Sequence, residues 1–350
     1  DLIVVGAGPA GSVAAYTAAK EGLKTLLIEK EKMPRYKACG GALTLKSINF
    51  LKSRNLFDRS NIERIHRKMK IFFMNREVAT IKGKKIVTLV NRAKFDFSLA
   101  KKAEKAGAIV RDGESVKKIK ISSNNVKIVT SKGCYSCKAL IGADGVNSTV
   151  ARLTNLRKGW KSHEVALALE TSIPLIKDFE SDCIQIYFNS KCPGYGWVFP
   201  RKDSINIGLG CRVAEFVQPK DNFFQFVKNV LNFDCRNLKY HAHLIPIAGS
   251  FKEPKVYAQR ILLTGDAAGF VDPWTGEGIY YAMLSGEIAA KVINEAKQTG
   301  LKKESLEKYW KICKKRFWKN LEIGFHFSQT FYKHLNFSMR LLKNDKIIQQ

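Results

Sequence analysis

The first thirty residues constrain the fold more than any other part of the chain. A short apolar run, Leu2–Val5, leads into the glycine-rich sequence Gly6–Gly11. A helix-favouring run over Ser12–Glu21 follows, and Lys24–Glu29 forms a second apolar run that ends in an acid. This order predicts a strand, a helix and a second strand parallel to the first, which is the opening unit of an open α/β sheet.

The glycine spacing predicts what the first turn binds. Gly6 allows a tight turn, Gly8 lets a pyrophosphate approach the backbone, and Gly11 lets the helix pack closely on the strand. The N-terminus of the helix then faces the phosphates. Glu29, at the end of the second strand, can accept hydrogen bonds from ribose hydroxyls. We therefore expect a dinucleotide at this turn.

Two later strands end in acidic turns. Ala139–Gly145 ends in Gly-Asp-Gly and places Asp144 in its turn, and Arg260–Ala268 places Asp266 at its carboxyl edge. Ligands of open parallel sheets bind at the carboxyl ends of strands, so both acids are expected near the nucleotide. The predicted helix Ile279–Ala296 begins just after this second turn, and its first N–H groups can stabilise negative charge on a reduced flavin. These segments favour FAD over NAD.

The remaining sequence has a different character. Short alternating strands predict an antiparallel sheet, interrupted by a helix over Phe216–Leu231. From Leu301 onward the pattern is helical and basic, with one apolar stripe formed by Leu306, Tyr309, Cys313, Phe317 and Leu321.

The expected fold is an α/β protein with a GxGxxG FAD-binding, three-layer Rossmann-like domain. An antiparallel β-sheet substrate domain is inserted in it, and a C-terminal helical segment follows. The expected boundaries are 1–50, 85–154 and 255–300 for the FAD-binding domain, 51–84 and 155–254 for the β-rich domain, and 301–350 for the helical segment.

The charge is the unusual feature of the composition. Lys and Arg number 60 against 31 Asp and Glu, which gives a net charge of +29. Such an excess attracts nucleic acid or an anionic membrane surface, or it is compositional and spread over solvated faces. No nucleic-acid module is recognisable, so no nucleic-acid partner is expected. The basic stretch around Trp310, Phe317 and Trp318 has two interpretations, a helix on anionic lipid or a helix packed on the FAD-binding domain.

No metal site is expected. Cys134 and Cys137 flank the second strand of a predicted hairpin, where residues three apart point to opposite faces. His241 and His243 share a strand face, but no third ligand is evident nearby, so ordinary strand residues are favoured.

Three motifs carry a resemblance to a known family. They are Pro34–Gly41, Tyr195–Pro200 (Tyr-Gly-Trp-Val-Phe-Pro) and Gly265–Gly278. Together they resemble the FAD enzymes that include p-hydroxybenzoate hydroxylase, and more closely their geranylgeranyl reductase branch, of the digeranylgeranylglycerophospholipid reductase type. Two positions depart from the family pattern: its signature proline falls on Cys192, and its third glycine after the cysteine is Ala42.

The glycine motif and the resemblance together imply the site residues. Cys39, Tyr195 and Trp197 are the expected catalytic residues, with Cys39 near the flavin ring and the two aromatics lining the substrate cavity. The expected FAD contacts are Gly6, Gly8, Ala10, Gly11, Glu29, Lys30, Lys37, Ala38, Gly40, Arg92, Val116, Asp144, Asp266, Gly276, Gly278 and Ile279.

The resemblance implies an FAD-dependent oxidoreductase that reduces C=C bonds of a prenyl (geranylgeranyl) chain on a lipid, quinone or chlorophyll-type substrate. An isolated alkene has no carbonyl to stabilise added hydride, so proton and hydride must arrive almost together. Positive charge then develops on the substituted carbon, and the faces of Tyr195 and Trp197 could stabilise it. Cys39 could donate the proton, since a free thiol is mostly protonated at neutral pH, or form a small polarisable wall.

Two alternatives remain open at this point, an FAD-dependent monooxygenase of an aromatic or polyprenyl substrate and a non-enzymatic basic binding protein. A second glycine-rich nucleotide fold is absent, so the reductant is expected to be a transiently bound NADPH or a ferredoxin-like donor. No leader is recognisable, and no apolar run reaches the length of a membrane span. We expect a cytoplasmic monomer, with peripheral contact at the inner face of an anionic membrane left open by the charge.

Overall fold

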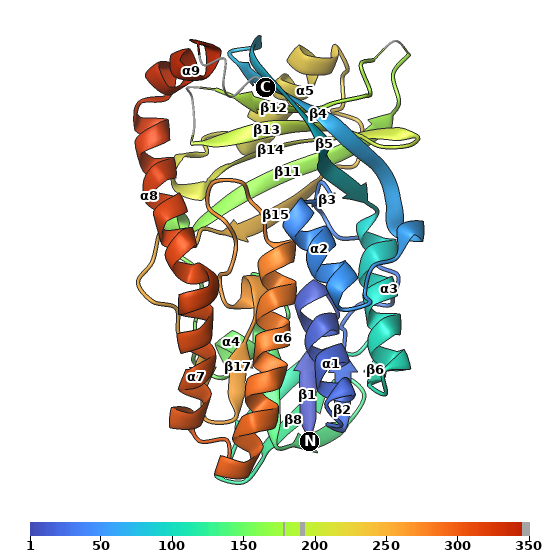
Figure 1. Cartoon of the computed structure of the whole chain (residues 1–350), viewed down its shortest axis with the longest axis vertical. Helices are drawn as coiled ribbons and strands as arrows, with labels where there is room; N and C mark the ends of the chain where they lie inside the picture. The colour runs from blue at the N-terminus through green and yellow to red at the C-terminus, as the bar shows by residue number, and fades with distance from the viewer. Residues whose placement is uncertain (178, 190–192, 345–350) are drawn as a thin grey trace.

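Two sheets dominate the computed structural model, which describes residues 1–177, 179–189 and 193–344. Figure 1 shows a smaller sheet with its helices at one end of the molecule and a larger sheet across the other end. Cys192, one of the two departures from the family pattern, lies outside the described residues.

The smaller sheet has the strand order β16-β17-β10-β1-β2-β6, with every pair parallel except β16–β17. Its strands β1 and β10 are buried on both faces, which is what their unbroken apolar sequences predict. The strand bounds are β1 Leu2–Val5, β2 Thr25–Ile28, β6 Ile109–Arg111, β10 Ala139–Gly142, β16 Tyr257–Ala258 and β17 Ile261–Leu263.

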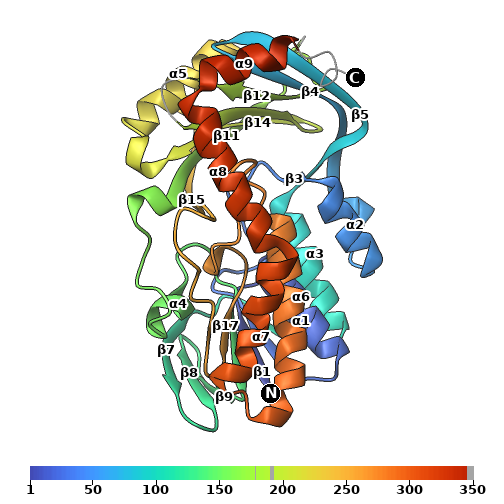
Figure 2. The ribbon, with the colours of Figure 1, turned by 60° about the vertical axis from the view of Figure 1, so that its left-hand side comes forward.

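Helices cover one face of this sheet and a small β-sheet covers the other (Figure 2). The helices are α1 (Pro9–Lys20), α3 (Arg92–Lys105) and α6 (Ile279–Ala296). The covering sheet is β7 (Val116–Ile121), β8 (Val126–Thr130) and β9 (Cys134–Cys137), and the short helix α4 (Thr149–Leu153) follows β10. The three-layer Rossmann-like architecture expected from the sequence is confirmed.

The hairpin β8–β9 also confirms the prediction for its two cysteines. Cys134 is exposed and Cys137 is buried. Because the two thiols lie on opposite faces of the strand, they do not converge on one metal.

The larger sheet has the order β15-β11-β14-β13-β12-β4-β5-β3 and is antiparallel except between β12 and β4. Its β5 runs past residue 84, one of the expected domain boundaries, and the division of the chain into domains stays a prediction. The strand bounds are β3 Ala42–Leu43, β4 Ile62–Phe73, β5 Arg76–Val90, β11 Val165–Pro174, β12 Ile184–Phe188, β13 Gly194–Pro200, β14 Ser204–Arg212 and β15 His241–Pro246. Helix α2 (Leu45–Ser53) leads into this sheet, and α5 (Pro219–Leu231) packs on it.

The chain continues after α6 through α7 (Lys303–Cys313), a π-helical turn (Lys314–Trp318), α8 (Lys319–Lys333) and α9 (Leu335–Asn344). Figure 1 shows α7 and α8 running along one side of the molecule from the smaller sheet to the larger one. The apolar stripe predicted for this segment is buried throughout.

The aromatic side chains of this segment resolve its two interpretations. Trp310, Phe317 and Trp318 are all buried, and each of the three packs against Phe270 in the core. These rings are therefore unavailable to a lipid surface, and the interpretation as a helix packed on the FAD-binding domain is correct. Within the described residues, no helix is both long and apolar enough to cross a membrane.

Candidate active site

In the glycine turn between β1 and α1, backbone atoms fill the space beside Gly6 and Gly11, and only Gly8 has open space next to it. A Cβ on Gly6 would lie 2.4 Å from the Ala143 carbonyl oxygen, and one on Gly11 would lie 1.8 Å from the Gly6 carbonyl oxygen. At Gly8 the nearest atom belongs to the flexible Arg35 side chain, 3.7 Å away. Gly8 is also the N-cap of α1 and no side chain caps it. Open backbone at an uncapped helix N-terminus is suited to a pyrophosphate.

Glu29 is held beside this turn. One carboxylate oxygen accepts a hydrogen bond from the Ala7 N–H at 2.8 Å and the other from the Glu31 N–H at 3.2 Å. Arg35 approaches the same carboxylate, with its Nε 3.6 Å away. A carboxylate has about four acceptor sites, so this fixed group retains capacity for ribose hydroxyls. Lys30 is exposed next to it.

The other predicted nucleotide contacts gather at the start of α6. A Cβ on Gly278 would lie 3.4 Å from Asp266 Oδ1, and one on Gly265 would lie 3.1 Å from the Ala10 Cβ. Gly278 is the N-cap of α6, again without a side-chain cap, and Ile279 is the first helical residue. Asp266, Ala10 and the α6 N-terminus therefore lie together, as the parallel-sheet rule predicts.

Two predicted contacts lie at the margin of this group. Val116 opens β7 in the covering sheet and is buried. Asp144 accepts hydrogen bonds from Ser148 Oγ at 2.5 Å and from the Val150 N–H at 3.0 Å, so its carboxylate stabilises the start of α4. Burial raises the pKa of Asp144. Both carboxylate oxygens of Asp144 are already bonded within the turn that precedes α4, so Asp144 is the predicted FAD contact that the geometry supports least.

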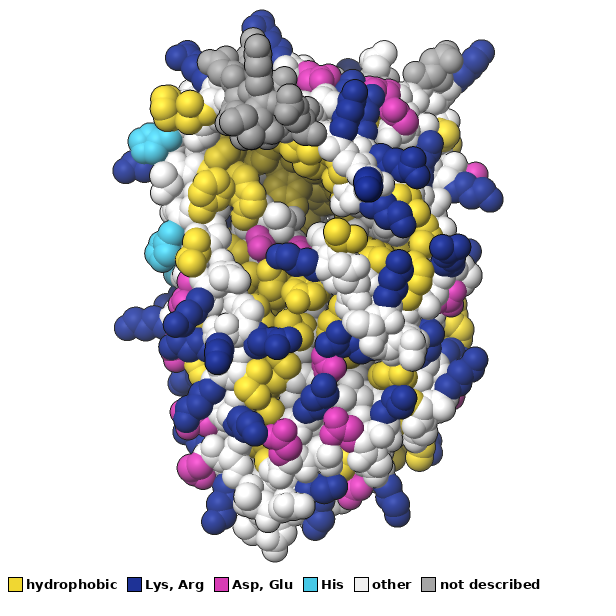
Figure 3. Space-filling model, in the orientation of Figure 1, with side chains coloured by type: hydrophobic (Ala, Val, Ile, Leu, Met, Phe, Trp, Pro, Cys, Tyr) yellow, Lys and Arg dark blue, Asp and Glu magenta, His cyan; other side chains and the backbone are white. Residues whose placement is uncertain are grey.

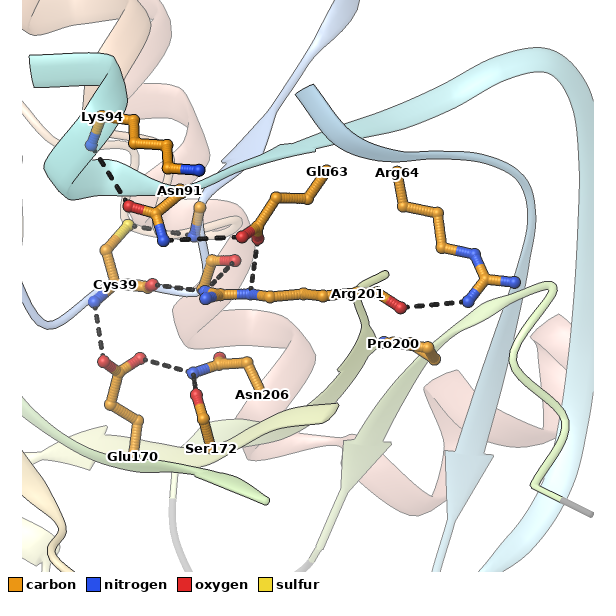
Figure 4. Close-up of polar contacts among 12 residues, drawn as sticks. Cys39, Glu63, Arg64, Asn91, Lys94, Glu170, Ser172, Pro200, Arg201 and Asn206 are labelled. Atoms are coloured by element: carbon orange, nitrogen blue, oxygen red, sulfur yellow. Dashed lines mark hydrogen bonds and ion pairs between the residues drawn. The ribbon is translucent and has the colours of Figure 1, made fainter. Parts of the chain in front are cut away.

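The segment from Arg35 to Gly41 brings the cysteine to the nucleotide site. Arg92 forms an ion pair with Asp96 at 2.9 Å and also interacts with the Cys39 side chain. Arg201 donates hydrogen bonds to the carbonyl oxygens of Cys39 and Gly40 at 3.3 and 3.2 Å (Figure 4). Cys39 and Arg92, predicted from separate parts of the sequence, are therefore neighbours.

Lys37 meets a histidine that the sequence analysis treated as an ordinary strand residue. Its Nζ lies 2.5 Å from His243 Nε2. Burial lowers the pKa of Lys37, and burial together with the Lys37 charge lowers the pKa of His243 to about 3. His243 is therefore neutral at pH 7 and accepts a hydrogen bond from the ammonium. The one sequence signal that could have pointed to this contact is the two-residue spacing of His241 and His243, which puts both rings on the same face of β15. His241 also packs on the segment that carries Lys37, because it stacks on Tyr36 with 4.0 Å between ring centroids.

A largely apolar cavity of about 650 Å³, open solvent at its mouth included, lies beside this segment. Tyr195 and Trp197 of β13 line it, together with residues of β14, β15, the turn Asp272–Gly276 and α8. Figure 3 shows hydrophobic side chains around a hollow in the upper half of this face. The Tyr195 hydroxyl donates to the Thr275 carbonyl at 2.5 Å, which joins the cavity wall to the turn before α6.

Glycines leave the space that these aromatic rings occupy. A Cβ on Gly208 would lie 2.1 Å from the Trp197 ring, and one on Gly276 would lie 2.9 Å from the Tyr195 hydroxyl. A Cβ on Gly40 would lie 3.4 Å from Trp197 Nε1. The backbone next to Cys39 therefore lies directly against the aromatic wall, and the expected catalytic residues are brought to one place.

The open Gly8, the fixed Glu29 and the two uncapped helix ends fit FAD, and the adjoining apolar cavity fits a hydrophobic substrate. Fold and site thus define a flavin-dependent oxidoreductase with a second, largely antiparallel sheet. A family model described as an FAD binding domain matches residues 1–221.

Named relatives narrow this class. The chain is 32% identical to a digeranylgeranylglycerophospholipid reductase of Methanocaldococcus jannaschii, over 100% of this chain and 87% of the relative. It is 31% identical to a chloroplastic geranylgeranyl diphosphate reductase of Nicotiana tabacum, over 95% and 75%. A geranylgeranyl bacteriochlorophyll reductase-like protein from Thermoplasma acidophilum superposes with a TM-score of 0.85 at 27% identity, covering 100% of this chain and 91% of the other. The chain belongs to the geranylgeranyl reductase family of FAD-dependent oxidoreductases.

Substituting the two glycines separates ligand binding from packing. In Gly8→Ala the new methyl group enters open space, so the stability of the apoprotein should stay within about 0.5 kcal/mol while FAD affinity falls at least about tenfold. In Gly11→Ala the methyl group meets the Gly6 carbonyl oxygen, and the free energy of unfolding should fall by about 1–3 kcal/mol. Urea denaturation and FAD titration measure the two effects, and unchanged FAD affinity in Gly8→Ala would contradict the site.

His243 should make stability sensitive to acid. Its folded pKa of about 3 lies below the unfolded value of about 6.5, so between these values the unfolded chain binds more protons. The free energy of unfolding should therefore fall as pH drops through this window, by up to about 1.4 kcal/mol per pH unit more in wild type than in His243→Asn.

Urea denaturation between about pH 4 and pH 7 tests this sensitivity. His334→Asn, which changes an exposed histidine at the end of α8, is the matched control and should retain the wild-type slope. Parallel profiles for wild type and His243→Asn would show that His243 titrates normally.

Proposed function

We propose that this protein reduces C=C bonds in the geranylgeranyl chain of a membrane lipid, and that quinone and chlorophyll-type side chains are the related substrates to compare. The observation that carries the proposal is an apolar cavity lined by Tyr195 and Trp197, in which the Trp197 ring lies against Gly40, next to Cys39. A long apolar chain fits such a cavity because its burial needs no hydrogen-bonding partners. The names of the relatives support the same substrate class.

A bound flavin would supply hydride, and the residues of this chain would orient the alkene and exclude water. The faces of Tyr195 and Trp197 would stabilise positive charge on the substituted carbon by about 0.5–2 kcal/mol each. Burial raises the pKa of the Tyr195 phenol, so this ring remains neutral. Cys39 would either donate the proton or form the small wall of the site, and its Sγ accepts a hydrogen bond from the Gly41 N–H at 3.4 Å.

The FAD contacts proposed here form three groups. The glycine turn with Glu29 would hold the pyrophosphate and ribose, and Asp266 with the α6 N-terminus would meet the flavin. The segment around Lys37–Gly40, with Arg92, would pack beside the ring. NADPH or a ferredoxin-like protein would reduce the flavin, and the enzyme would act as a monomer.

We also propose that the protein binds peripherally to an anionic membrane, through a surface other than the basic segment around Trp310. An apolar patch on α8 and α9 consists of Ile323, Phe327, Phe337 and Leu341, whose exposed fractions range from 54% to 67%. Phe327 packs on Trp274 with 5.0 Å between ring centroids, and Trp274 lines the cavity. The α8 part of the patch is thus continuous with the cavity wall through Phe327, and the net charge of +29 favours an anionic surface.

Anaerobic reoxidation tests the proposed reaction. Reduced holoenzyme mixed with a geranylgeranyl lipid should regain the oxidised flavin spectrum, with two hydrogens added per reduced bond. Trp197→Leu should slow this step about 2- to 30-fold because it removes the aromatic face. Trp197→Phe keeps an aromatic face but loses the hydrogen bond from the indole N–H to Asn206, so it should slow the step less than Trp197→Leu does. An equal rate in wild type and Trp197→Leu would contradict the role of the indole.

Two further outcomes of this experiment are decisive. Full activity in Cys39→Ser with normal flavin content would assign Cys39 to the wall and exclude an indispensable thiol proton. Reoxidation that begins only when oxygen is admitted, together with a hydroxylated product, would replace the reductase by the monooxygenase.

Liposome flotation tests the membrane proposal. The wild-type protein should float with vesicles that contain anionic lipid, and added salt should weaken binding. The double variant Phe337→Ser/Leu341→Ser should bind more weakly because it removes apolar area from the patch. Val217→Ser changes an apolar residue before α5 that is 73% exposed, more than Phe337 or Leu341, and should behave as wild type. Failure of the wild type to float would refute the proposal.

A further inference from the structure

A buried carboxylate links the cysteine segment to the substrate sheet. Glu170 of β11 is 3% exposed and is not among the residues that line the cavity. Its Oε1 accepts hydrogen bonds from the Cys39 N–H at 3.0 Å and from the Tyr36 hydroxyl at 2.7 Å. Its Oε2 accepts one from Asn206 Nδ2 at 3.2 Å (Figure 4).

Asn206 carries this linkage on to the cavity wall. Asn206 is 1% exposed, and its Oδ1 accepts a hydrogen bond from Trp197 Nε1 at 2.8 Å. An indole N–H only donates, so Asn206 must present its oxygen to Trp197 and its amide nitrogen to Glu170. The backbone N–H of Cys39 also only donates. The cysteine segment therefore donates to Glu170 directly, and Trp197 of the cavity wall is linked to the same carboxylate through Asn206.

These hydrogen bonds are what stabilise the Glu170 carboxylate. Among the residues that the structure describes, no Lys, Arg or His side chain forms an ion pair with Glu170, whereas nearby Glu29, Asp96 and Glu63 each have an Arg partner. A buried carboxylate without a cationic partner depends on the hydrogen bonds that it accepts, so the loss of one donor is costly.

We propose that Glu170 and Asn206 are positioning residues, which fix the Trp197 indole relative to the Cys39 segment and so set the narrow gap between the two, on which the position of the aromatic cavity wall depends. The consequence for catalysis rests on the proposed prenyl reductase activity. The packing makes this gap sensitive to small shifts, since a Cβ on Gly40 would lie 2.7 Å from the Phe199 ring and 3.4 Å from Trp197 Nε1. Misplacement of a reacting group by about 1 Å can cost about 100-fold in rate.

The direction of the hydrogen bonds supplies a specific test. In Glu170→Gln the shape is kept, but no orientation of the two amides satisfies Cys39, Trp197 and the bond between positions 170 and 206 together. In Asn206→Asp two carboxylates face each other. In Glu170→Gln/Asn206→Asp the acceptor and donor are exchanged: the glutamine amide donates to the new aspartate, which also accepts from Trp197, and the glutamine oxygen still accepts from Cys39.

The primary measurement is the ¹H–¹⁵N resonance of the Trp197 indole in the holoenzyme, identified by its absence in Trp197→Phe. Each single variant should shift this resonance, and the double variant should return it toward the wild-type position. With a geranylgeranyl lipid, kcat/KM should fall about tenfold in each single variant and recover to within about threefold in the double variant.

Glu287→Gln is the matched control. Its carboxylate is also buried, but it pairs with Arg54 and Lys291 near α2 and α6, outside the cavity lining. This variant should leave both the Trp197 resonance and kcat/KM unchanged.

Two results would overturn the proposal. One is a Trp197 indole resonance that neither single variant shifts, and the other is a resonance shifted as far in the double variant as in the single variants. If the wild type does not reduce the lipid at all, the proposed function fails. In that case the Trp197 indole resonance still decides whether Glu170 and Asn206 position Trp197, because its measurement needs no turnover.

Discussion

Hydrogen bonds and ion pairs made by one segment, Arg35–Gly41, hold the two sheets of this molecule in a fixed relation. Arg35 pairs with Glu29 and Asp96 on the nucleotide side. Two residues on, Lys37 pairs with His243 of the larger sheet, and the Cys39 N–H donates to Glu170. The segment contacts both halves in turn, so it couples the position of the glycine turn and Glu29 to that of the larger sheet.

Glycines set how closely these parts approach. The absence of a Cβ lets the Gly40 backbone reach the Trp197 ring and lets that ring lie over Gly208. Gly8 differs because its missing side chain leaves space for a ligand rather than for protein. The same residue type therefore serves packing at most of these positions and leaves open space at one, and only the surrounding atoms distinguish the two cases.

The elements that surround the candidate nucleotide site, and the helical segment after them, could be predicted because their determinants are local. The βαβ unit, the helix Ile279–Ala296 and the apolar stripe from Leu306 to Leu321 are all found as expected, since hydrophobic periodicity and turn glycines act over a few residues. The pairing of Lys37 with His243 could not be predicted, because it joins a loop residue to a strand residue 206 positions away. A buried glutamate in a strand such as Glu170 gives no sequence signal of its partners.

The sequence by itself determined the class of cofactor and the layers of the fold, because glycine spacing and apolar periodicity encode backbone geometry directly. Its three motifs carried the resemblance to the family. Tertiary structure decided which aromatic side chains are exposed to a possible membrane surface. It buried Trp310, Phe317 and Trp318, which the sequence left open to a membrane, and exposed Phe327 and Phe337 instead. Burial and hydrogen-bond direction depend on which distant strands come together, and this information is held by packing rather than by any single segment.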